Sequence, residues 1–195
     1  MKIILVRHGQ TEWNLLQKYQ GQTDIPLTDL GRKQAQAAGE YLANIEKIEA
    51  LYCSDLSRTK ETAEIIGNSI NLNPKSDSRL RELCFGLWEG LTFTEVYEKY
   101  PKEFDNWYND THKTKVPEGE SFEQLIERAM ETLTEILERH TGTVVVVTHG
   151  GVIKGVLSQS VDKNDMWQTG VDPGSITILE ATGDKMQPIK IGLVP

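Results

Sequence analysis

A chain of 195 residues with 38% hydrophobic and 26% charged side chains has a globular composition and can bury a core without disulfides. Its 29 acidic and 21 basic residues give a net charge of −8, which argues against a nucleic-acid partner. Cys53 and Cys84 form no Cys-x-x-Cys motif, and no apolar run approaches membrane-spanning length. We therefore expect buried, reduced thiols, one domain over residues 1–195, and a cytoplasmic protein with no membrane partner.

The first third of the chain predicts two strand-to-helix units. Residues 3–6 and 50–53 are short apolar runs, typical of strands that are buried in a parallel sheet. Between them, Thr28 or Asp29 can cap a helix. The apolar face of that helix is expected to contain Leu30, Ala38, Tyr41, Leu42 and Ile45. The second strand is followed by a helix predicted over 57–67.

The next segments carry clear boundary signals. Ser57 lies near the N-cap of the second helix, and Gly67 is expected to end it. Residues 93–110 predict two short helices separated at Pro101, and residues 111–120 are typical of an exposed loop. Trp13, Trp107 and Trp167 are expected to pack in the interior rather than bind a ligand, whereas Trp88, which lies near Glu82, is the exception that could contact a ligand.

The most strongly patterned helix comes next, with Ser121 and Gln124 as a capping box at its start. Its core-facing stripe consists of Phe122, Leu125, Ile126, Ala129, Leu133, Ile136 and Leu137. A strand, a helix, a strand and an edge strand are then predicted at 143–149, 151–160, 175–181 and 186–195. Pro188 is expected to confine the last strand to the edge. The alternation of strands and helices predicts an α/β fold with a mostly parallel sheet.

Three strand-to-helix junctions carry side chains that are unusual for a structural core. They are Arg7-His8-Gly9, Arg58 within "SDLSRT", and Thr148-His149-Gly150-Gly151. Ligands of open α/β sheets bind beyond the carboxyl ends of parallel strands, so we expect two arginines and two histidines to meet there. Like charges are costly in a core, but arginine forks and helix N-termini suit a phosphate dianion.

The histidines indicate what would happen to a bound phosphoryl group. Nearby positive charge lowers the pKa of an imidazole, and the neutral ring can attack phosphorus to give a phosphohistidine. The arginines and the second histidine would stabilise the phosphoryl group in transit. The leaving alkoxide needs a proton, and "RELCFG" offers Glu82 beside Arg81. The sequence therefore predicts phosphomonoester chemistry at this edge.

Six motifs in order along the chain resemble the histidine phosphatase superfamily, the phosphoglycerate-mutase-like proteins. They are "LVRHGQTEWN", "YQGQTDIPLTDLG", "SDLSRTKETA", "RELCFGLWEG", "PEGES" and "VTHGG". The resemblance covers nearly the whole chain. It implies a three-layer α/β/α sandwich with a mostly parallel central sheet and one antiparallel edge strand.

The same resemblance implies roles for individual residues. His8 would be the phosphorylated nucleophile, and Glu82 would be the general acid and later the base for water. Arg7, Arg58 and His149 would bind and stabilise the phosphoryl group. The phosphate cradle would be completed by Asn14, Gln20, Gly21 and the Gly150 backbone. No metal or organic cofactor is implied, and the partner would be a small phosphorylated metabolite, bound by a monomer or homodimer.

Within the superfamily, the chain resembles phosphatases more than mutases. Cofactor-dependent phosphoglycerate mutases carry Arg, Tyr and Lys after the acid, where this chain has Leu83, Phe85 and Phe93. Without those basic groups, the phosphohistidine should be passed to water. Leu83, Phe85, Leu87 and Trp88 are expected to make the pocket wall apolar, which fits a larger or less charged alcohol. The "FGLWEGLT" stretch resembles α-ribazole-5′-phosphate phosphatases of cobalamin assembly and broad-specificity phosphatases.

Other functions stay open. Phosphoglycerate mutase, fructose-2,6-bisphosphatase and phosphoserine phosphatase activities are compatible with the motifs, as is a catalytically silent module that binds a phospholigand. A metal enzyme with His8, His149 and Glu82 as ligands is disfavoured, because no H-x-H or H-E-x-x-H spacing is present and two arginines would oppose a divalent cation.

Overall fold

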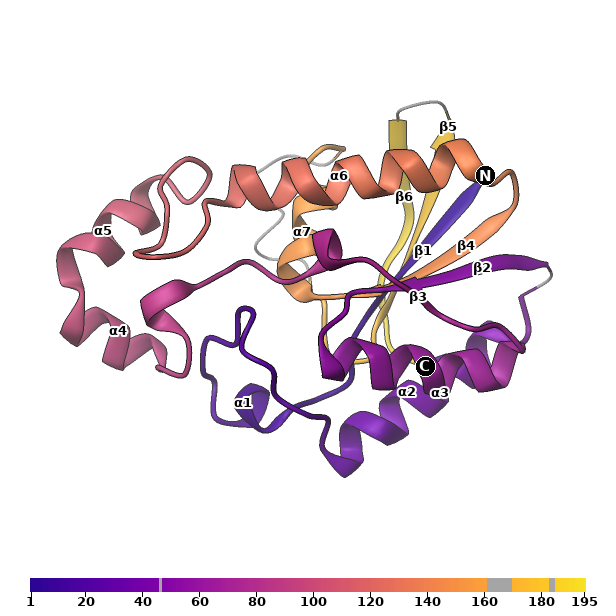
Figure 1. The fold of residues 1–195 in the computed structure, drawn as a ribbon, viewed down its shortest axis with the longest axis horizontal. Coiled ribbons are helices and arrows are strands. Elements are labelled where there is room, and N and C mark those ends of the chain that lie inside the picture. Colours follow the sequence, from indigo (N-terminus) through magenta and orange to yellow (C-terminus); the bar gives the residue numbers. More distant parts are fainter. Residues whose placement is uncertain (46, 161–169, 183–184) are drawn as a thin grey trace.

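The structure, a computed structural model, describes residues 1–45, 47–160, 170–182 and 185–195, so the predicted packing of Trp167 lies outside the described residues. Six strands form one sheet in the order β3-β2-β4-β1-β5-β6 (Figure 1). Their bounds are β1 Lys2–Arg7, β2 Ile48–Cys53, β3 Lys75–Ser76, β4 Thr143–Thr148, β5 Ile176–Thr182 and β6 Lys185–Leu193. The first four strands of the sheet are parallel, while β5 runs antiparallel to both β1 and β6.

Helices cover both faces of the sheet, with α2 and α3 on one face and α6 and α7 on the other (Figure 1). The helices are α1 Glu12–Leu15, α2 Asp29–Leu42, α3 Ser57–Ile70, α4 Phe93–Lys99, α5 Pro101–Asn109, α6 Phe122–Arg139 and α7 Gly150–Leu157. Side chains alternate along β1, so Ile4 and Val6 join the core under α2 and α3, whereas Ile3 and Leu5 join the core under α6 and α7. The predicted three-layer α/β/α fold with a mostly parallel sheet is confirmed.

Two predictions for the first half of the chain are wrong, one about a helix face and one about a helix end. Leu30 is 50% exposed, because the buried face of α2 is instead made largely of small residues that let it pack closely on α3. Gly67 does not end α3, which continues to Ile70 and is capped by Asn71 in the left-handed conformation. A Cβ atom at Gly67 would lie 2.3 Å from the carbonyl oxygen of Leu72, so this glycine permits a close backbone approach inside the helix.

The predicted break at Pro101 is confirmed, since proline occupies the first turn of α5. The α4–α5 pair projects beyond the end of the sheet (Figure 1). It is held by an aromatic cluster around the fully buried Trp88, which contacts the rings of Phe104 and Trp107. The cluster therefore fixes two short helices beside the strand ends.

The cysteines are both free, but only Cys53 is buried and Cys84 is partly exposed, so the expectation of two buried thiols is half wrong. Cys84 lies in the irregular segment between two 3₁₀ turns, Ser78–Leu80 and Gly86–Trp88, where the backbone runs near the surface. Among the described helices, none has both the length and the apolar character that crossing a bilayer requires.

Candidate active site

The register of the sheet aligns the three unusual junctions. Arg7 at the end of β1 is paired with Thr148 at the end of β4, and Cys53 at the end of β2 is paired with Val147. The ladder continues past the strands, because the amide of His8 donates to the carbonyl of Thr148 at 3.0 Å. The side chains that follow β1, β2 and β4 therefore lie at one edge of the sheet, as the sequence predicts.

His8 is 2% exposed and held in one orientation. Its Nδ1 lies 2.7 Å from the carbonyl oxygen of Gly9, and since a carbonyl only accepts, Nδ1 carries the proton and Nε2 of the neutral ring has the lone pair. Burial, followed by the charges of Arg58 and Arg7, lowers the pKa of His8 well below its ordinary value. The ring is therefore neutral at physiological pH, as a nitrogen nucleophile requires.

The two arginines are anchored by backbone carbonyls. Arg58 is fully buried in the first turn of α3 and donates from Nη1 to Thr23 at 2.8 Å and from Nη2 to Gly21 at 2.6 Å. Arg7 donates from Nη1 to the carbonyl of Val171 at 2.7 Å. Burial lowers the pKa of Arg58 to about 10, which still leaves it cationic at neutral pH. The buried Nε atoms of both arginines have no hydrogen-bond partner among the described residues.

His149 is the N-cap residue of α7 and is fully buried. Its ring lies edge-on to that of His8, with the centroids 5.2 Å apart. Burial and then the charge of Arg58 lower the pKa of His149, and neither ring nitrogen has a partner within the described part of the chain. Buried polar atoms are normally paired, and three of these four nitrogens carry a hydrogen when the His149 ring is neutral. They therefore indicate a place for an anion with several oxygen acceptors.

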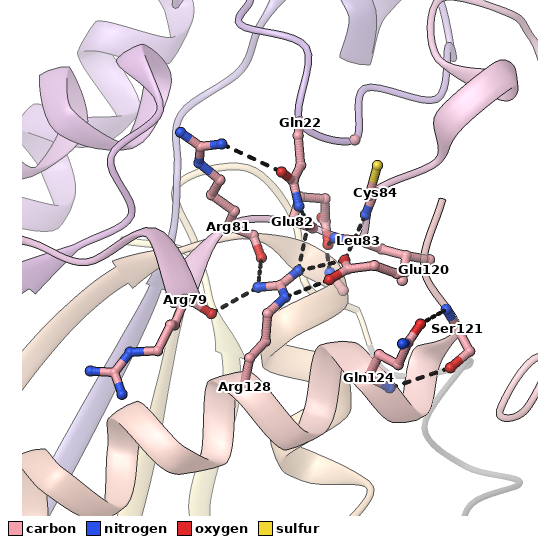
Figure 2. Close-up of polar contacts among 12 residues, drawn as sticks. Gln22, Arg79, Arg81, Glu82, Leu83, Cys84, Glu120, Ser121, Gln124 and Arg128 are labelled. Atoms are coloured by element: carbon pink, nitrogen blue, oxygen red, sulfur yellow. Dashed lines mark hydrogen bonds and ion pairs between the residues drawn. The ribbon is translucent and has the colours of Figure 1, made fainter. Parts of the chain in front are cut away.

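Glu82 reaches the same site from the segment after the first 3₁₀ turn. Its Oε1 accepts from the amide of Leu83 at 2.9 Å, and its Oε2 accepts from the amide of Gly151 at 3.0 Å. Its charge acts on both Arg7 and Arg58, raising their pKa values against the effect of burial. The carboxylate is thus fixed between its own backbone and the start of α7, and Figure 2 shows the polar contacts of the segment that carries it.

The remaining predicted cradle residues take indirect positions. The side-chain oxygens of Asn14 and Gln20 both accept from the Thr11 hydroxyl, at 3.0 and 2.8 Å. Asn14 also forms a capping box at the start of α1, in which its side-chain oxygen accepts from the Thr11 amide and its own amide donates to the Thr11 hydroxyl. Gly21 contributes the carbonyl that binds Arg58, while Gly150 lines the cavity at the start of α7. The sequence predicted these four as cradle residues, and of them only Gly150 borders the open cavity.

A cavity of about 380 Å³ opens beside this cluster. Its lining consists of Arg7, Tyr19, Glu82, Leu83, Phe85, Trp107, Phe122, Gly150, Gly151, Lys154 and Val171. The prediction that Leu83 and Phe85 line the cavity is confirmed, whereas the same prediction for Leu87 and Trp88 is wrong. The second 3₁₀ turn directs Leu87 to solvent at 41% exposure and Trp88 into the aromatic cluster under α4 and α5.

Sequence reasoning missed other wall residues. Lys154 was detectable, because it lies one helical turn after Gly150 and therefore on the same side of α7. Trp107 was interpreted as interior packing, and it does both, since it is buried in the aromatic cluster and borders the cavity. Val171 gives no signal in sequence. Within the described residues, no three His, Cys, Asp or Glu side chains are grouped as a metal-binding set.

The lowered histidine pKa values predict a pH-dependent stability. The unfolded chain binds protons at His8 and His149 as the pH falls below about 6.5, whereas the folded chain keeps both rings neutral. Unfolding is therefore favoured by acid, by on the order of 1 kcal/mol per histidine between pH 7 and 5.5. Urea unfolding at both pH values checks this. The His8→Asn variant should lose about half of the effect, and an unchanged pH dependence in that variant would contradict it.

Comparison with known proteins agrees with this geometry. The family model of the histidine phosphatase superfamily (branch 1) matches residues 3–193. Phosphoserine phosphatase 1 of Hydrogenobacter thermophilus is 36% identical over 182 residues, which are 92% of this chain and 86% of that protein.

Solved structures share the whole fold. The structure of Bacillus stearothermophilus YhfR is 35% identical and covers 96% of this chain and 95% of its own, with a TM-score of 0.87. An Escherichia coli structure whose name refers to an alpha-ribazole-5′-P phosphatase is 25% identical. It covers 99% of this chain and 96% of its own, with a TM-score of 0.88. This chain is therefore a phosphatase that belongs to the histidine phosphatase superfamily, branch 1.

Proposed function

We propose that this phosphatase hydrolyses the monoester of a small phosphorylated metabolite through a phosphohistidine at Nε2 of His8. The observation that carries the proposal is a neutral, buried imidazole under the influence of two arginines, whose buried Nε atoms have no hydrogen-bond partner among the described residues. Arg7, Arg58 and His149 would hold the phosphoryl oxygens. Such fixed donors in a buried site stabilise the charge of phosphoryl transfer without reorganisation.

Two steps complete the reaction. In the first, the lone pair of Nε2 forms a bond to phosphorus, the bond from phosphorus to the alcohol oxygen breaks, and the carboxyl of Glu82 gives that oxygen its proton. In the second, the Glu82 carboxylate takes a proton from water, the water oxygen attacks phosphorus, and the P–N bond breaks. Inorganic phosphate leaves, and both His8 and Glu82 return to their starting protonation. Of the residues expected to form the cradle, Gly150 borders the cavity, whereas Gly21 acts indirectly by holding Arg58, and Asn14 and Gln20 act indirectly through Thr11. The reaction uses no metal or organic cofactor.

The cavity walls favour an alcohol with an apolar or aromatic part. Four aromatic residues, Tyr19, Phe85, Trp107 and Phe122, line the 380 Å³ space into which the leaving group would project. Aromatic walls recognise flat ring systems by stacking and edge contacts. We therefore favour an α-ribazole-5′-phosphate-type or broad-specificity phosphatase, in line with the name of the Escherichia coli relative.

One feature favours a second candidate, a phosphorylated hydroxy or amino acid such as phosphoserine. Lys154 lies in the cavity wall beyond Arg7 and is half buried. Burial lowers its pKa, an effect to which Arg7 adds and which Glu82 opposes. An ammonium in this place can pair with a carboxylate on the leaving group, and the Hydrogenobacter thermophilus relative is named for phosphoserine.

A substrate panel with a matched variant separates the two candidates. We expect α-ribazole 5′-phosphate to give the highest kcat/KM, ahead of phosphoserine, 3-phosphoglycerate, fructose 2,6-bisphosphate and p-nitrophenyl phosphate. Lys154→Met should leave α-ribazole 5′-phosphate almost unchanged and lower phosphoserine about tenfold, the value of one charge-assisted contact. Phosphate release in the presence of EDTA is the measurement. Highest activity on phosphoserine, lost in the variant, would establish the second candidate, and comparable low values throughout would indicate broad specificity.

A further inference from the structure

The "PEGES" motif, residues 117–121, lies outside the cavity, and the reaction above gives it no role. Its Ser121 caps α6, and its Glu120 pairs with Arg128 two turns along the same helix. Figure 2 shows that Arg128 points away from α6 toward the segment that carries Glu82.

The Arg128 guanidinium uses all five of its N–H donors. Nη1 donates to the carbonyls of Arg79 at 2.7 Å and Arg81 at 2.5 Å, and Nη2 donates to the carbonyl of Glu82 at 2.8 Å. The other two donors bind Glu120, with Nε to Oε1 at 2.9 Å and Nη2 to Oε2 at 2.8 Å. Lysine has three donors on one nitrogen and cannot reproduce this planar pattern.

Glu120 holds the other side of the same segment. Its Oε2 also accepts from the amide of Cys84 at 2.9 Å, and its own amide donates to the Cys84 carbonyl at 2.9 Å. The two backbones are in direct contact, because a Cβ atom at Gly119 would lie 2.2 Å from that carbonyl oxygen. Arg128 and Glu120 thus fix the main chain immediately before and after Glu82 and Leu83.

The Glu82 carboxylate depends on this backbone. One of its oxygens is held by the amide of Leu83, the residue between the two fixed points. Arg128 and Glu120 are themselves shielded, with side chains 18% and 22% exposed. Burial acts to raise the pKa of Glu120, but the hydrogen bonds from Arg128 and Cys84 prevail and lower it, so the pair stays ionised. Breaking a shielded pair that is also bonded to backbone leaves several groups unsatisfied.

We propose that Arg128 and Glu120 are positioning residues that aim the Glu82 carboxyl at the leaving oxygen. The proposal rests on the proposed function of Glu82 as general acid. A merely structural pair would affect all substrates alike. A positioning pair affects the proton transfer, and so matters most for alcohols that cannot leave without a proton.

The experiment measures kcat/KM for a series of phosphate monoesters that runs from p-nitrophenyl through phenyl to an alkyl phosphate. The variants are Glu82→Gln, Arg128→Met, Glu120→Gln and, as the control, Arg139→Gln. Arg139 lies on the same helix with a 61% exposed side chain and pairs with Glu135. We expect Arg128→Met and Glu120→Gln to lose about tenfold more activity on alkyl than on p-nitrophenyl phosphate, in the same direction as Glu82→Gln. Arg139→Gln should match the parent.

The outcomes separate the general-acid role of Glu82 from the positioning role of Arg128 and Glu120. Equal losses on all esters in Glu82→Gln would overturn the general-acid role, and with it this proposal. A leaving-group effect in Glu82→Gln but equal losses in Arg128→Met and Glu120→Gln would overturn the positioning role alone. If Arg128→Met does not fold, Glu120→Gln decides, because its amide oxygen can still accept from Cys84 while the charged fork to Arg128 is lost.

Discussion

Replacing His8 with alanine is expected to reduce kcat for every substrate by on the order of 10⁴-fold or more, because the variant lacks the nitrogen that forms the covalent intermediate. The parent protein should accumulate an acid-labile phosphoenzyme when it is quenched rapidly with a labelled substrate. The variant should show none. Because His8 contacts the carbonyl of its neighbour Gly9, the loss of its side chain leaves the main-chain ladder to Thr148 intact.

The matched control for this substitution is His112→Ala. His112 is partly exposed and lies 3.9 Å from Glu123, near the start of α6. The His112→Ala protein should retain parental activity and form a normal amount of phosphoenzyme. Turnover in the His8→Ala protein close to the parental rate, with a normal thermal transition, would remove His8 from the nucleophile role and favour direct attack by water.

Replacing Arg58 with alanine is expected to lower kcat/KM by about 10³-fold, in line with other arginines that stabilise phosphoryl transfer. Arg58 is fully buried and donates to the carbonyls of Gly21 and Thr23, so the same change leaves two acceptors unpaired. Its loss also removes one of the two charges that lower the pKa of His8. The acid limb of the pH–rate profile should therefore move to higher pH in the variant.

Arg32→Gln is the control for charge removal. Arg32 is an exposed arginine of α2 that pairs with Glu61 of α3 at 2.6 Å, so it bridges α2 and α3 away from the site. We expect its kcat/KM to be parental. A pH profile that does not move in Arg58→Ala, together with a loss of less than about tenfold, would show that Arg58 is structural.

The sequence predicted most of the fold because its strongest signals are local. Residues 3–6 and 144–147 are continuous apolar runs, and only strands covered on both faces tolerate that pattern. The capping box at Ser121 and the break at Pro101 are decided within four residues of chain, and both are confirmed. The same reasoning brought Arg7, His8, Arg58 and His149 to one edge, because strand-end residues meet wherever parallel strands are neighbours.

The predictions that proved wrong concern residues whose burial depends on segments far away in the sequence or on the local course of the backbone. Leu30 looked like a core residue, but the faces that α2 and α3 present to each other were decided by small residues that allow close packing. Leu87 and Trp88 are adjacent, and only the course of a 3₁₀ turn determines which of them is buried. The contacts of Arg128 could not be predicted, since nothing local indicates three carbonyls some 46 to 49 positions away.

The antiparallel direction of β5 has a consequence for how the site can vary. A parallel strand delivers to this edge the loop that follows it, whereas β5 delivers the loop that precedes it, and that loop supplies the Val171 carbonyl to Arg7. The amide of Gly174 in turn bonds back to the carbonyls of Arg7 and His8. Changes in the length or composition of the chain before β5 can therefore reshape the wall of the cavity while the histidines stay fixed on β1 and β4. The chain before β5 thus contributes both a wall residue of the cavity and an anchor of Arg7, whereas the ends of β1 and β4 place the two histidines.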